Sequence, residues 1–166
     1  MNATPQTVGG WRRILGSLAL AVLLEQLPWS GWALALRPDF VLVGVLFWAL
    51  HQPARIGFGT AFFLGLLADF QDGAVFGQHA IAYAIDVYLV LFLRLRLLQF
   101  DPFRQAAQLF PILLTGQLAV LLVGWLAVNP PTGLVILLPI LSSTLLWYLI
   151  AGFVRLWHGK GLRGQA

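Results

Sequence analysis

Long apolar runs follow one another along the chain, and each ends at a short polar or proline-containing stretch. Between residues 105 and 154 there is no Asp, Glu, Lys, Arg or His. One helical membrane span needs about 20 apolar residues, so this stretch predicts two helices. They must be separated at Asn129-Pro130-Pro131-Thr132, because paired prolines cannot continue a helix.

The same pattern predicts four more helices upstream, with breaks at Pro28, at Arg37-Pro38, at residues 51–55 and at Asp72-Gly73. The six predicted segments cover residues 14–27, 39–50, 56–70, 78–93, 109–128 and 133–156. Pro111 and Pro139 lie inside the last two and should kink or start helices there. The pattern therefore predicts an all-α, polytopic membrane helical bundle of about six transmembrane segments.

Two of the predicted segments are short for a membrane span. Residues 39–50 and 56–70 contain 12 and 15 residues, which gives helices of about 18 and 22 Å. The hydrocarbon core of a bilayer is about 30 Å thick. These segments either include flanking residues, lie against other helices where the membrane is thinned, or form a re-entrant pair that leaves four full spans.

Composition supports the membrane class. Of 166 residues, 60% are hydrophobic, 10% are charged and none is Cys. Soluble domains average about 25% charged residues, which argues against a soluble enzyme, a disordered chain and a disulfide-rich secreted domain. The lack of Cys excludes thiolate zinc sites, iron–sulfur clusters and cysteine nucleophiles. We expect one transmembrane helical domain, residues 14–156, between cytoplasmic tails 1–13 and 157–166.

The basic residues predict the orientation. If the N-terminus is inside, nine of the ten Lys and Arg residues lie on the cytoplasmic side and only Arg37 lies outside. The nine are Arg12, Arg13, Arg55, Arg94, Arg96, Arg104, Arg155, Lys160 and Arg163. This asymmetry predicts that both termini are cytoplasmic. The net charge of +4 does not indicate nucleic-acid binding, because the basic residues are spread between apolar runs.

The N-terminal region also has features of a signal peptide. Arg12-Arg13, the apolar run 14–24 and Ala33-Leu34-Ala35 give a charged start, a core and small residues. However, the intervening residues are many and include Trp29 and Trp32, which favour the membrane interface. We interpret the region as an uncleaved first span with tryptophan anchors on the outer side.

Acidic residues inside apolar segments are costly and usually have a role. Asp86 lies near the middle of segment 78–93, and the spacing places His79, Ala82 and Tyr83 on the same helix face. It either forms a polar pocket or proton-linked site, or is a protonated or hydrogen-bonded group that joins neighbouring helices. Glu25 either projects inward from the first span or lies near the outer headgroups.

A stripe of small residues marks the third segment. Gly57, Ala61, Gly65 and Asp69 recur every four residues on one helix face. Such a stripe allows another helix to approach closely. Since Asp72 and Gly77 follow it, the region is either tight helix packing closed by a glycine turn or a cation-binding, anion-repelling outer mouth.

No catalytic, cofactor or metal site is predicted. His51 and His158 fall on the cytoplasmic side and His79 on the outer side, so the histidines cannot share a metal. The serines lack a neighbouring base or a nucleophile-elbow sequence, and there is no phosphate-binding glycine loop.

Three stretches together resemble the MreD family of rod shape-determining proteins of the bacterial inner membrane. They are Arg37-Pro38-Asp39-Phe40, GFGTAFFLGLLAD at residues 57–69 and DGAVFGQHA at residues 72–80. The resemblance covers about residues 37–100, and the last two predicted spans match in length and hydropathy only.

The resemblance implies a non-enzymatic, multi-pass inner-membrane component of the cell-elongation complex. It implies partners similar to MreC and MreB, a SEDS-type glycosyltransferase and a class B penicillin-binding protein that make side-wall peptidoglycan. Contacts with membrane lipids are expected, and no small-molecule substrate. We expect partner binding or helix packing at Arg37, Asp39, Gly57, Ala61, Gly65, Asp69, Asp72, Gly77 and His79.

One alternative follows from the same resemblance. The family is distantly similar to the six-helix substrate-binding subunits of energy-coupling-factor vitamin transporters. In those subunits a vitamin binds at the outer face, where Arg37, Asp39, Asp69, Asp72 and His79 would lie here.

Overall fold

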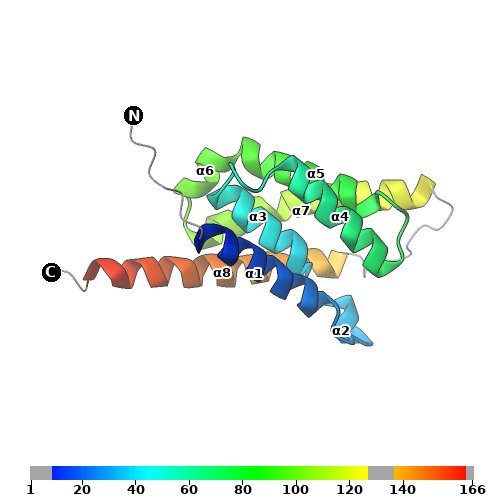
Figure 1. Ribbon diagram of the computed structural model, residues 1–166, viewed down its shortest axis with the longest axis horizontal. Coiled ribbons are helices and arrows are strands. Elements are labelled where there is room, and N and C mark those ends of the chain that lie inside the picture. The colour runs from blue at the N-terminus through cyan, green and yellow to red at the C-terminus, as the bar shows by residue number, and fades with distance from the viewer. Residues whose placement is uncertain (1–8, 127–136, 164–166) are drawn as a thin grey trace.

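The computed structural model describes residues 9–126 and 137–163, and every regular element in these ranges is a helix. Six longer helices are joined with two short ones: α1 (Gly9–Glu25), α2 (Trp32–Ala35), α3 (Phe40–His51), α4 (Phe58–Asp72), α5 (Gln78–Phe92), α6 (Arg94–Gln99), α7 (Pro102–Leu126) and α8 (Leu138–Arg163). The longer helices lie side by side along the long axis (Figure 1). The all-α prediction is confirmed.

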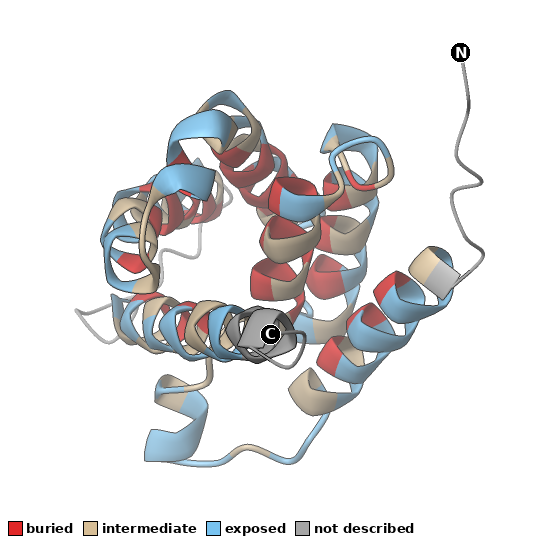
Figure 2. Cartoon of the chain, turned by 90° about the vertical axis from the view of Figure 1, so that its left-hand side faces the viewer, coloured by how far each residue is buried: buried red, intermediate tan, exposed pale blue. Residues whose placement is uncertain are grey.

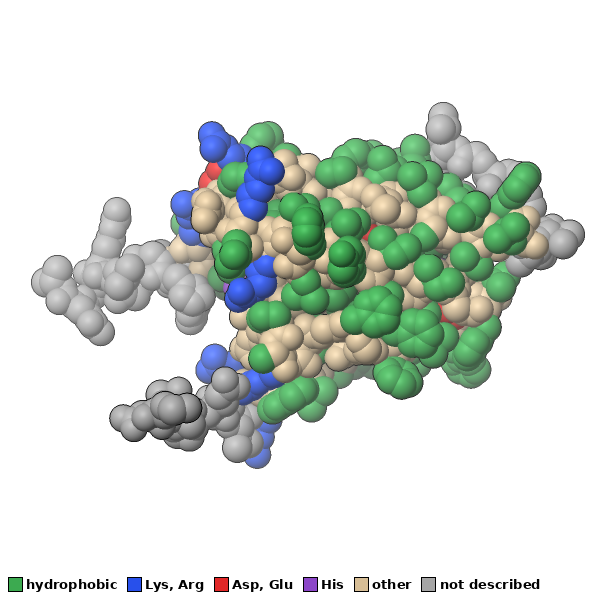
Figure 3. Space-filling model, turned by 90° about the horizontal axis from the view of Figure 1, so that it is seen from above, with side chains coloured by type: hydrophobic (Ala, Val, Ile, Leu, Met, Phe, Trp, Pro, Cys, Tyr) green, Lys and Arg blue, Asp and Glu red, His purple; other side chains and the backbone are tan. Residues whose placement is uncertain are grey.

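The two ends of the bundle are chemically different. The start of α1, the short helix α6 and the end of α8 lie at one end, and α2 lies at the other (Figure 1). We call the first the basic end, because Lys and Arg side chains gather there on the face that Figure 3 shows. Hydrophobic side chains cover much of the remaining surface of that face. The second is called the α2 end.

The helix breaks follow the local sequence. Residues 51–55 separate α3 from α4 as predicted. Gly73 ends α4 in the left-handed region at φ 60°, which only glycine adopts without strain. Gly77 precedes α5 at φ 97°. The break predicted at Asn129–Thr132 lies outside the described residues.

Several boundaries differ from those predicted. α1 begins at Gly9 and α8 continues to Arg163, so parts of both predicted tails are helical. α7 begins at Pro102 rather than near residue 109. Pro111 lies inside α7, so of the two alternatives expected for it, a kink or a helix start, it does not start the helix. Pro102 suits the first turn of α7, because the N–H that proline lacks would have no helical partner there. Pro139 lies at the start of α8, as predicted.

Several helices are apolar enough for a membrane. By length and composition, three segments could each cross one: Trp32–His51, which includes α2 and α3, Pro102–Leu126 and Leu138–Leu156. α5 is apolar but shorter. Large apolar side chains, such as Phe63 at 73% exposure and Phe92 at 74%, lie on the surface. A soluble monomer does not expose such extensive apolar surface.

The two short central helices form much of the core. α3 buries residues on most of its circumference, including Val41, Val43, Val45 and Leu46, which is the pattern of a helix enclosed by others. α5 buries Tyr83, Val87 and Val90. In the view along the bundle, buried residues lie where helices face one another (Figure 2). The short segment 39–50 is therefore enclosed by neighbouring helices, one of the arrangements expected for it.

Candidate functional site

Polar residues from five parts of the chain meet at the α2 end of the bundle, and they include Arg37, Asp39, Asp69, Asp72 and His79, which were expected at the outer face. We call this group the polar network. Its members are Glu25, Arg37, Asp39, Asp69, Asp72, His79, Tyr83 and Ser143. They come from the end of α1, the segment before α3, the end of α4, the first half of α5 and the first half of α8.

Asp69 of α4 caps the start of α5. Its carboxylate accepts hydrogen bonds from the backbone N–H of Gly77 at 2.8 Å and of His79 at 2.7 Å. His79 Nδ1 lies 2.9 Å from the same carboxylate. Asp69 is only 1% exposed. A carboxylate is favoured at this position because the first N–H groups of a helix have no partner within it.

The small-residue stripe lets α4 approach α5 closely enough for this cap. A Cβ placed on Gly65 would lie 2.5 Å from Ala80 Cα and 2.7 Å from the His79 carbonyl oxygen. Ala61 is fully buried, while Gly57 precedes α4 and meets nothing closer than 4.0 Å. The middle of the stripe thus packs inside this chain, which leaves other surfaces for partner proteins.

Asp39 connects three helices. Its side chain caps α3 by accepting from the Leu42 N–H at 2.7 Å. The Tyr83 hydroxyl of α5 donates to the same carboxylate at 2.7 Å. The Asp39 N–H donates to Ser143 Oγ of α8 at 2.9 Å. The start of α3 is therefore held against α5 and α8.

Glu25 and Arg37 connect α1 to this end of α3 and α4. Glu25 Oε1 accepts from the Val41 N–H at 3.1 Å, so its carboxylate turns toward the start of α3. Arg37 donates to the Glu25 carbonyl oxygen at 3.1 Å. Its second terminal nitrogen lies 3.2 Å from Asp72 Oδ1, in a partly exposed ion pair.

Asp86 lies deeper in the bundle and is different from the other carboxylates. It is fully buried, and neither oxygen has a hydrogen-bond partner among the described residues. Gly116 of α7 lies against it, since a Cβ added to Gly116 would lie 2.6 Å from Asp86 Cγ. The carboxyl group therefore sits directly against the α7 backbone, at a position that only glycine leaves open.

A small polar cavity joins Asp86 to the network. Its volume is about 50 Å³. The four residues predicted to share a face of α5, His79, Ala82, Tyr83 and Asp86, all line it. Ser143 and Gln117 line it too. This volume is enough for a few water molecules, since one needs about 10–15 Å³.

The carboxylates of the network are engaged in hydrogen bonds. Asp39 and Asp69 are occupied with backbone N–H groups, and no group of three His, Cys, Asp or Glu residues that could hold a metal occurs in the described residues. Sequence reasoning missed Ser143 as a member of the network and Gln117 as a lining residue of the cavity. Ser143 was considered only as a nucleophile, and its partner Asp39 lies 104 residues away.

The whole site lies within a region matched by a known family. A family model described as rod shape-determining protein MreD matches residues 7–157. The chain is also similar to the rod shape-determining protein MreD of Haemophilus influenzae, with 31% identity over 80 residues. That match covers 48% of this chain and 49% of the Haemophilus protein, so it spans about half the length of each. No solved structure matches.

Proposed function

The chain belongs to the MreD family of rod shape-determining proteins, and we propose that it is a non-enzymatic membrane component of the cell-elongation complex. In this role it links proteins similar to MreC and MreB to side-wall peptidoglycan synthesis by a SEDS-type glycosyltransferase and a class B penicillin-binding protein. The observation that carries the proposal is the family match over residues 7–157. The matched region contains the complete polar network.

The bundle supports a role in holding partners. The polar network fixes the ends of α1, α3, α4, α5 and α8 at one end of the molecule. Its buried carboxylates are occupied in capping and joining helices. Such an end would present loops and helix ends in a fixed arrangement, which suits the binding of a partner outside the membrane.

We further propose six membrane crossings, by α1, α3, α4, α5, α7 and α8, in the bacterial inner membrane. The basic end would be cytoplasmic, with both termini, and the α2 end would face outward. The gathering of Lys and Arg side chains at the basic end supports this orientation (Figure 3). Arg37, at the α2 end, is held by Glu25 and Asp72.

Single-cysteine labelling tests the topology, because the native chain has no Cys to give a background signal. Ser30→Cys, in the exposed link before α2, should react with an impermeant maleimide added to intact spheroplasts. Ala54→Cys, in the exposed link between α3 and α4, should react only after permeabilisation. Labelling of both from the outside, or protection of Ala54→Cys even after permeabilisation, would contradict six crossings in this orientation.

The alternative function, vitamin binding at the outer face, has little support from the geometry. The cavity lined by Asp39 and His79 is about 50 Å³, whereas pockets for small organic ligands are about 300–1,000 Å³. We therefore propose no second function.

Co-purification tests the partners directly. We would tag the C-terminus, solubilise native membranes in a mild detergent and identify the recovered proteins by mass spectrometry. An unrelated tagged multi-pass protein of similar abundance is the control. Specific recovery of an MreC-like protein with wall synthases is expected. Recovery of paired ATPases with a transport coupling subunit would contradict the proposal and favour the vitamin-binding alternative.

A further inference from the structure

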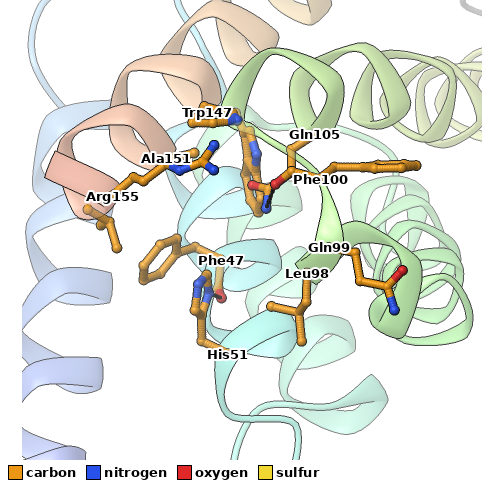
Figure 4. A pocket seen from close by; sticks show the side chains of 11 residues that line it. Phe47, His51, Leu98, Gln99, Phe100, Gln105, Trp147, Ala151 and Arg155 are labelled. Carbon is orange, nitrogen blue, oxygen red and sulfur yellow. Dashed lines mark hydrogen bonds between the residues drawn. The ribbon is translucent and has the colours of Figure 1, made fainter. Parts of the chain in front are cut away.

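A second, larger cavity lies at the basic end of the bundle. Its volume is about 530 Å³, and it opens between the end of α3, α6, the start of α7 and the second half of α8. Figure 4 shows the side chains around it, which include Phe47, Leu98, Gln105, Trp147, Ala151 and Arg155. We call it the basic-end cavity. It shares no lining residue with the small cavity at Asp86.

A buried residue beside the basic-end cavity has a hydrogen-bond donor without a partner. Trp147 is 1% exposed, and its Nε1–H has no acceptor in the described part of the chain. Buried indole N–H groups normally have a hydrogen-bond partner, because burying the donor without a hydrogen bond is unfavourable. A ligand oxygen in the cavity would supply that partner.

The rim of the cavity is positively charged. Arg155 is exposed and forms no ion pair within residues 9–126 and 137–156. No Asp or Glu lines the cavity, and the nearby Asp101 is paired with Arg104 at 3.3 Å. A guanidinium and an N–H donor without a competing carboxylate favour an anionic group with several acceptor oxygens.

Apart from His51, Gln99 and Gln105, the rest of the lining is apolar. Phe47, Leu98, Phe100 and Ala151 contribute hydrocarbon surface to the same cavity. A small inorganic anion would leave this surface uncovered, whereas a lipid carries a phosphate and hydrocarbon chains in one molecule. The volume of about 530 Å³ is in the usual range for ligand pockets, about 300–1,000 Å³.

We propose that the basic-end cavity binds the headgroup of an anionic phospholipid. The phosphate lies near Arg155 and the Trp147 N–H, and the start of the acyl chains covers Leu98 and Phe100. Basic pockets between membrane helices recognise anionic headgroups through the same combination of charge and apolar surface. This site is separate from the polar network. The binding of a specific lipid there would be a further property of the protein, beside its proposed role in elongation.

Lipid retention in bilayers tests the site. The full chain would be placed in nanodiscs of phosphatidylethanolamine with or without phosphatidylglycerol, and native mass spectrometry would measure the lipid that remains bound. We expect preferential retention of phosphatidylglycerol and a higher unfolding temperature in its presence. Arg155→Gln should weaken retention about tenfold, the effect of losing one charge-assisted hydrogen bond. Arg104 does not line the cavity, so Arg104→Gln should not weaken retention.

A second pair of variants tests the cavity without changing charge. Ala151→Phe fills it and should abolish preferential retention, whereas Ala107→Phe, on the exposed face of α7, should leave retention unchanged. If Ala151→Phe proves unstable in phosphatidylethanolamine alone, Trp147→Phe removes only the N–H donor and should weaken retention several-fold.

Three results would overturn the proposal. The first is equal phosphatidylglycerol retention by the wild type, Arg155→Gln and Trp147→Phe. The second is binding of inorganic phosphate or glycerol phosphate as tight as binding of the lipid, which would indicate a soluble anion site. The third is photo-crosslinking from Leu98 to a polypeptide in native membranes, which would indicate a protein-binding groove.

Discussion

The Tyr83 hydroxyl of α5 donates a hydrogen bond of 2.7 Å to the Asp39 carboxylate, which caps α3. This contact connects the two helices that contribute the largest shares of the buried core. It also lies between the Asp69–His79 pair and Ser143, since Tyr83 packs edge-on against His79 at 6.3 Å between ring centroids. The Tyr83 side chain therefore contacts both the Asp39 carboxylate and the His79 ring within the network.

Tyr83→Phe should destabilise the bundle by about 1.5–3 kcal/mol, the usual value for a hydrogen bond to a charged group. The free energy of unfolding would be measured by SDS titration in mixed micelles. Tyr88→Phe is the matched control, because Tyr88 is on the same helix, is 61% exposed and has no hydrogen-bond partner for its hydroxyl among the described residues. Equal stability of both variants would show that the Tyr83–Asp39 contact does not hold α3 against α5.

Asp69→Ala should be more damaging, with a loss of at least about 2 kcal/mol, because the N–H groups of Gly77, His79 and Ala80 at the start of α5 lose their acceptor. Asp72→Ala removes a carboxylate three residues away that is 41% exposed and pairs only with Arg37. Its cost should be at most about 1 kcal/mol. Thermal unfolding in detergent compares the two, and a larger effect of Asp72→Ala would contradict the assigned cap.

Gly65→Ala should destabilise by about 1–3 kcal/mol, because the added methyl group meets the Ala80 backbone and α4 must move away from α5. Gly59→Ala, in the same helix with nothing within 4 Å, should be neutral or slightly stabilising. Stability and partner recovery would be measured for both variants. Loss of partners by Gly65→Ala at unchanged stability would show that Gly65 contacts a partner rather than α5.

Asp86→Asn should change stability by less than about 1 kcal/mol and leave cell shape normal, because the amide has the same shape and the carboxylate has no hydrogen-bond partner to lose. Asp86→Lys should fail to accumulate, since a larger charged group would be buried against Gly116. Complementation of a depletion strain and immunoblotting measure both effects. Loss of shape with normal accumulation of Asp86→Asn would favour a proton-linked role.

The local parts of the fold were predictable from the sequence. The positions of proline and glycine predicted the breaks around residues 51–55 and at Gly73. Proline restricts the backbone conformation and glycine allows conformations that other residues avoid, whatever the rest of the fold is. Spacings of three and four residues predicted the shared face of His79, Tyr83 and Asp86. The start of α7 at Pro102 was missed, although Asp101-Pro102 is a typical helix start.

The partners across helices were not predictable. The stripe at Gly65 indicated close packing but not that α5 is the neighbour. Tyr83 and Asp39 are 44 residues apart, and Asp39 and Ser143 are 104 apart. Pairings at such separations depend on how the helices are arranged in space. Helical periodicity in the sequence does not specify that arrangement. The lack of a partner for Asp86 likewise depends on α7 approaching at Gly116.

Depletion of the protein in its own bacterium tests the central claim most directly. Cell width and the incorporation of fluorescent D-amino acids into the side wall would be followed as the chain disappears, with a plasmid copy of the wild type as control. A component of the elongation complex predicts loss of side-wall incorporation and wider, rounded cells, both restored by the plasmid copy. Unchanged width and incorporation after complete depletion would contradict it.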